Sequence, residues 1–94
     1  MDTFAKLVEE IIKEQENIIG PLALEQANKV QGLKINWQKH EVVLEGDKTQ
    51  VLSKLVDQYK TLFGQASVEV CKEAASKFTE GIPQDQLPQT LRSS

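Results

Sequence analysis

The chain has 94 residues and a formal net charge of -3 at pH 7, with 39% hydrophobic and 27% charged residues. This length fits one small domain, and the composition is that of a folded protein, not of a disordered chain. The negative charge, with a pI near 5.1, argues against nonspecific binding to nucleic acid or to an anionic membrane surface. A lone cysteine and a lone histidine exclude an internal disulfide and a metal centre built from these residue types.

The start of the chain lacks the features of a secretion signal. Glu9 and Glu10 stand where the apolar stretch of a signal peptide would be, and no apolar run approaches the length of a membrane span. We therefore expect a cytoplasmic protein.

The first half of the chain, residues 4–31, has the spacing of amphipathic helices. Its apolar residues recur at steps of three and four, and Asp2 or Thr3 can serve as the N-cap. Gly20-Pro21 interrupts the pattern, because proline removes a helical hydrogen bond. We expect a bend of more than about 20° there, since sharp kinks sit at proline, and a second helix from Pro21 to about Gln31.

Residues 33–46 lose the helical period. The β-prone segment 41–45 is too short for a helix, so we expect one or two short extended segments or an ordered loop, with Trp37 and Val43 contacting the core.

The second half, residues 47–80, returns to helical spacing. Asp47 and Gln50 resemble a capping box, and Gly64 predicts a milder bend than Gly20-Pro21 because glycine keeps its N–H. Gly81 and Pro83 end the pattern, and residues 82–94 are predicted to form a mobile polar tail.

Shifting the chain by 44 residues superimposes the two halves without a gap. A glycine follows an apolar pair in both halves, although two amphipathic helices can always be slid into phase. A duplication and an accidental match both remain open. The predicted fold is all-α: four helical segments in two bent helix–Gly–helix units, one domain over residues 1–81, with a short extended segment between the units.

The segment Ile18-Ile19-Gly20-Pro21-Leu22-Ala23 resembles the Ile-Gly-Pro-x-Ala segment of short helical modules appended to bacterial signalling proteins, including some serine/threonine kinases. Residues 55–66 are a looser echo, with Gln65 in place of the proline. The resemblance implies a regulatory or docking module without catalytic residues.

The sequence offers no catalytic grouping, so we expect no enzyme and no metal or other cofactor. No nucleophile motif accompanies His40, and Cys71 occupies an apolar helical position typical of a buried thiol.

The absence of catalytic groupings and the wide apolar stripes favour a protein-interaction module that pairs with a second copy or with another protein. The predicted interface lies on the first helix: Phe4, Leu7, Val8 and Ile11. The alternative is a small-ligand-binding domain with a pocket between the two helix pairs, where Trp37, Tyr59 and Phe63 would anchor a ligand or partner.

Overall fold

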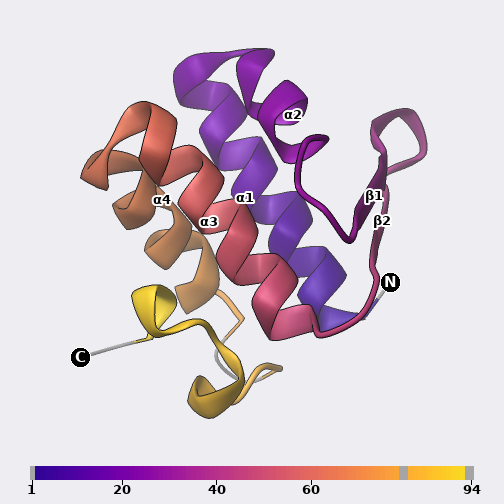
Figure 1. The fold of residues 1–94 in the computed structure, drawn as a ribbon, viewed down its shortest axis with the longest axis vertical. Helices are drawn as coiled ribbons and strands as arrows, with labels where there is room; N and C mark the ends of the chain where they lie inside the picture. The colour runs from indigo at the N-terminus through magenta and orange to yellow at the C-terminus, as the bar shows by residue number, and fades with distance from the viewer. Residues whose placement is uncertain (1, 79–80, 93–94) are drawn as a thin grey trace.

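The computed structural model describes residues 2–78 and 81–92. Four helices pack side by side, and a short hairpin lies along one flank of the first helix (Figure 1). The elements are α1 (Thr3–Ile19), α2 (Leu22–Ala27), β1 (Leu33–Asn36), β2 (Glu41–Leu44), α3 (Lys48–Phe63) and α4 (Gln65–Ser76), with single 3-10 turns at Trp37–Lys39, Gln84–Gln86 and Gln89–Leu91.

The prediction of an all-α fold is wrong, because β1 and β2 pair as an antiparallel hairpin. Alternate residues of β2, Val42 and Leu44, are buried, and Leu33 opposes Leu44 in the register. This alternation lets β2 place its apolar side chains against α1. The turn between them contains no glycine. The Asn36 side chain accepts a hydrogen bond from the Lys39 N–H, and His40 adopts the left-handed conformation, with φ of 54°.

Aspartate side chains begin both long helices. Asp2 accepts a hydrogen bond from the Ala5 N–H (2.8 Å), and Asp47 accepts from the N–H groups of Thr49 and Gln50. Each cap satisfies backbone donors that the first helical turn leaves free.

Glycine ends both long helices in the same way. Gly20 and Gly64 have φ values of 69° and 81° with ψ values of -148° and -168°, and each N–H still bonds to the carbonyl four residues earlier. This backbone region is essentially restricted to glycine. The expected mild bend at Gly64 is therefore a complete break, after which α4 packs against α3 and α1 (Figure 1). The second helix is shorter than expected, since α2 ends at Ala27 and not near Gln31.

Two buried hydrogen bonds connect the helix pairs reciprocally. Gln15 Nε2 donates to the Ser67 carbonyl (2.9 Å), and the Tyr59 hydroxyl donates to the Ala23 carbonyl (2.7 Å). Each donor lies five residues before one of the two helix-ending glycines, and each acceptor lies three residues after the other. The first pair, α1–α2, is thus tied to the second, α3–α4, by two equivalent cross-links.

The residues after Gly81 return to the core. Although residues 82–94 were expected to form a mobile polar tail, Ile82, Leu87 and Leu91 are all buried. The Thr49 hydroxyl also donates to the Gln86 carbonyl (2.6 Å), which joins this segment to the start of α3. The expected end of the second half at Glu80 lies outside the described residues.

Candidate interaction surface

The predicted interface residues on α1 face the interior of the chain. Leu7, Val8 and Ile11 are fully buried, and Phe4 is partly buried against the same core. The hairpin and the segment after Gly81 contribute buried side chains to this core. The sequence predicts a core contact only from Trp37 and Val43 in the hairpin, and none from the segment after Gly81. Leu7, Val8 and Ile11 therefore present no exposed surface to which a second chain could bind.

The three predicted anchors lie in different environments. Tyr59 is buried, and burial raises its pKa well above the ordinary value. Trp37 is half-buried at the hairpin turn, with its ring centroid 5.8 Å from that of His40. Phe63 alone of the three lines the apolar hollow described below. The structure thus does not bring these residues together in one pocket.

Exposed leucines from α2 and α3 lie at the same level of the fold. Gln58 Nε2 donates to Gln26 Oε1 (2.7 Å), and this bond and the Tyr59–Ala23 bond together show that α2 and α3 run antiparallel. Leu22 lies one turn before Gln26, and Leu62 lies one turn after Gln58. Residues four apart share a helix face, so Leu22 and Leu62 lie on the faces of α2 and α3 that carry the bonded glutamines. Their exposed fractions are 45% and 50%.

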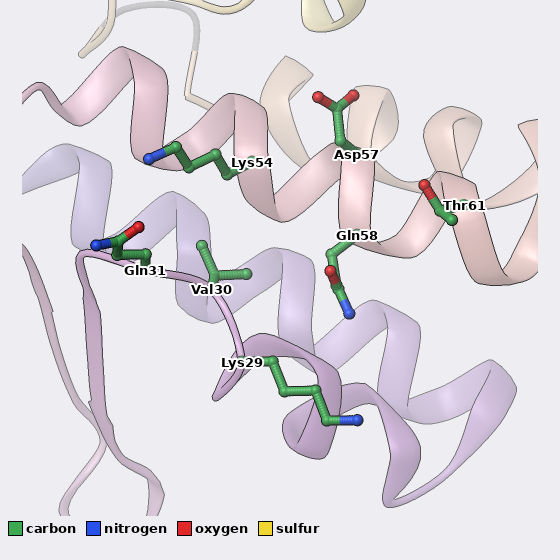
Figure 2. A pocket seen from close by; sticks show the side chains of 7 residues that line it. All are labelled: Lys29, Val30, Gln31, Lys54, Asp57, Gln58 and Thr61. Carbon is green, nitrogen blue, oxygen red and sulfur yellow. The ribbon is translucent and has the colours of Figure 1, made fainter.

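A polar groove lies between α3 and the segment after α2 (Figure 2). It has a volume of about 290 Å³, and its lining side chains are Lys29, Val30, Gln31, Lys54, Asp57, Gln58 and Thr61. Lys29 belongs to the segment after α2, whereas Lys54 and Asp57 project from α3 (Figure 2). We call the leucine pair and this groove together the α2–α3 seam.

The charged side chains along the seam are of both signs. Asp57 is acidic, Lys29 and Lys54 are basic, and all three are exposed. None of them forms an ion pair within residues 2–78 and 81–92. The seam therefore combines exposed apolar side chains with three charges that remain available to a partner.

An apolar hollow lies at the same end of the helices, between α1 and α4. Its volume is about 240 Å³, and its lining residues are Gln15, Ile18, Ile19, Phe63, Ala66, Ser67 and Val70. Gln15 and Ser67 are buried, so they form its floor, whereas Ile18 is 64% exposed at its rim.

The exposed residues Ile18 and Leu62 occupy equivalent positions in the sequence. An apolar pair precedes each helix-ending glycine, Ile18-Ile19 in α1 and Leu62-Phe63 in α3. The first member of each pair is the exposed one. An apolar pair alone does not indicate exposure, because both members of Leu7-Val8 and of Leu55-Val56 are buried.

Cys71 and His40, the titratable side chains considered from the sequence, differ in their exposure. Burial raises the pKa of the Cys71 thiol to about 11. His40 is exposed, with Nδ1 3.9 Å from a Glu9 carboxylate oxygen. No cluster of three or more His, Cys, Asp or Glu side chains within the described ranges could hold a metal ion.

Comparison with protein-family models, curated proteins and solved structures gave no match. In the described part of the chain, no helix has both the length and the apolar character needed to cross a membrane.

Proposed function

We propose that this protein is a non-catalytic, cytoplasmic interaction module that pairs with a second copy of itself through the α2–α3 seam. The observation that carries the proposal is the exposure of Leu22 and Leu62 on the bonded faces of α2 and α3, together with groove charges that form no ion pair within the described residues. Contiguous exposed apolar side chains with a polar rim are typical of protein–protein contacts. The resemblance of residues 18–23 to docking modules of bacterial signalling proteins agrees with a regulatory role.

The charge distribution favours a second copy as the partner. A two-fold dimer brings the same surface together twice, so a surface of one sign would repel itself. The groove carries one acid and two bases, which allows Asp57 of one chain to approach Lys29 or Lys54 of the other. Self-pairing therefore brings opposite charges together.

Sedimentation equilibrium tests this pairing directly. We expect the wild-type protein to be dimeric at micromolar concentrations and Leu62→Glu to be monomeric, because the new carboxylate would be desolvated in the contact. Since Leu62 is exposed, the thermal midpoint of the monomer should change little. Val43→Glu is the matched control, because Val43 is 54% exposed on the hairpin, outside the seam. A wild-type protein that stays monomeric at every concentration would contradict self-pairing.

The apolar hollow supports a second candidate function, the binding of a small ligand. Its walls come from both helix pairs, with Ile18 and Ile19 from α1, Phe63 from α3, and Ala66 and Val70 from α4. Small-molecule sites are concave and mostly apolar with few polar groups, and this hollow fits that description.

A further inference from the structure

Gln15, one of the residues that line the apolar hollow, carries a buried acceptor without a partner among the described groups. Gln15 is fully buried, and no described group donates a hydrogen bond to its Oε1. Leaving a buried acceptor unsatisfied is costly, and such groups in folded proteins call for a physical explanation.

The orientation of this amide is fixed by its other end. Gln15 Nε2 donates to the Ser67 carbonyl (2.9 Å) and lies 3.6 Å from Cys71 Sγ. Rotating the amide by 180° would bring Oε1 against the Ser67 carbonyl oxygen, so that two acceptors would face each other. The atom that lacks a partner is therefore the oxygen, and it requires a donor.

A water molecule is a poor candidate for that donor. A buried water usually makes about three hydrogen bonds, whereas the only polar residue that lines the hollow besides Gln15 is Ser67, the others being Ile18, Ile19, Phe63, Ala66 and Val70. The lining also contains no charged side chain, so a charged group would enter without compensation.

We propose that the hollow binds a small, neutral aromatic molecule with one N–H or O–H donor, which bonds to Gln15 Oε1 while its ring packs against Phe63. An apolar cavity of roughly 150 Å³ can already hold benzene, so about 240 Å³ accommodates a bicyclic ring such as indole. Aromatic pairs gain from offset or edge-to-face packing, which Phe63 can provide. The inference rests on the second candidate function and is independent of pairing through the seam.

The test compares indole with benzofuran, which has nearly the same shape but an oxygen in place of the N–H. Each compound is titrated into ¹⁵N-labelled protein, and the Gln15 side-chain amide and the backbone amides of Ala66 and Val70 are followed by NMR. We expect indole to bind at least about fivefold more tightly than benzofuran, because one hydrogen bond to a buried acceptor contributes an affinity difference of about this size.

Two variants locate the effect. Gln15→Met keeps the length of the side chain but removes the acceptor, so indole and benzofuran should bind equally. Ala66→Phe fills the hollow from its exposed rim and should abolish the binding of both compounds, whereas Val43→Phe, on the hairpin, should leave both affinities unchanged. Because Ala66 is exposed, the fold should tolerate this substitution even if Gln15→Met does not fold.

The possible failures are distinguishable. Equal affinities of the wild-type protein for indole and benzofuran would overturn the donor-bearing ligand class but leave ligand binding in the hollow intact. No binding of either compound at millimolar concentration would overturn both. Tighter binding of N-acetyltryptophanamide than of indole would also overturn the proposal, since the donor would then belong to a partner's tryptophan side chain.

Discussion

At the scale of single residues, burial determines how Cys71 behaves. The thiol lies among apolar side chains, and desolvation is the largest cause of its raised pKa of about 11, against an ordinary value of 9.0. The hydrogen bond from Gln15 opposes this shift without cancelling it. At neutral pH the thiol is protonated and inaccessible, so it acts as a small apolar side chain.

This raised pKa predicts a loss of stability in alkali. Between pH 9 and 11 the unfolded chain releases the thiol proton while the folded chain retains it, so the free energy of unfolding falls as pH rises. The slope from one such group is at most about 1.4 kcal/mol per pH unit. Urea unfolding from pH 8 to 10 should show this slope in the wild-type protein and a shallower one in Cys71→Ala.

The comparison uses the difference in slope, because Cys71→Ala also loses packing at neutral pH. Tyr59 contributes a similar fall above pH 10 in both proteins, since burial raises its pKa too. Two curves that remain parallel from pH 8 to 10 would show that the thiol ionises equally easily in the folded and unfolded chains.

At the scale of the elements, the helices follow from local rules, and the hairpin does not. The two aspartate caps, Asp2 and Asp47, and the two helix-ending glycines act on backbone groups a few residues away. They can be recognised in the sequence because they stand at the ends of the segments with helical spacing. The pairing of β1 with β2 depends instead on His40 in a left-handed conformation, which is uncommon outside glycine. A sequence pattern could therefore indicate extended segments at 33–46 but not the turn that pairs them.

The break at Gly64 predicts opposite effects for the two enantiomers of alanine. A Cβ at this position would meet no atom within 4 Å, so any cost comes from the backbone conformation alone. L-alanine should destabilise the protein by about 1–3 kcal/mol, because φ of 81° with ψ of -168° is strained for an L-residue. D-alanine, introduced by chemical ligation, prefers positive φ and should be neutral or stabilising. Thermal unfolding of the two proteins measures the difference, and equal midpoints would rule out backbone strain.

At the scale of the whole molecule, the core depends on which elements cover the first helix. The apolar stripe of α1 was correctly identified from periodicity, but the same stripe fits either an internal core or a dimer interface. Residues 82–92 decide between these alternatives, together with the hairpin, because they bury Ile82, Leu87 and Leu91. Two isolated leucines in a polar stretch carry no periodicity, so this contribution could not be predicted from the pattern of apolar residues. The seam was missed for a related reason, since it depends on how α2 and α3 are placed against each other.

The role of the C-terminal segment predicts that Leu87 stabilises the entire domain. Leu87 is 2% exposed, and truncating a buried leucine to alanine typically costs about 2–5 kcal/mol. Leu87→Ala should therefore lower the urea midpoint of a single cooperative transition, observed through the helical signal of the whole chain. Gln89→Ala is the matched control, because Gln89 is exposed in the same segment and its truncation should change stability by less than about 0.5 kcal/mol. If residues 82–94 were instead a mobile tail, both variants would unfold at the same urea concentration as the wild-type protein. That result would show that the core is complete without residues 82–94.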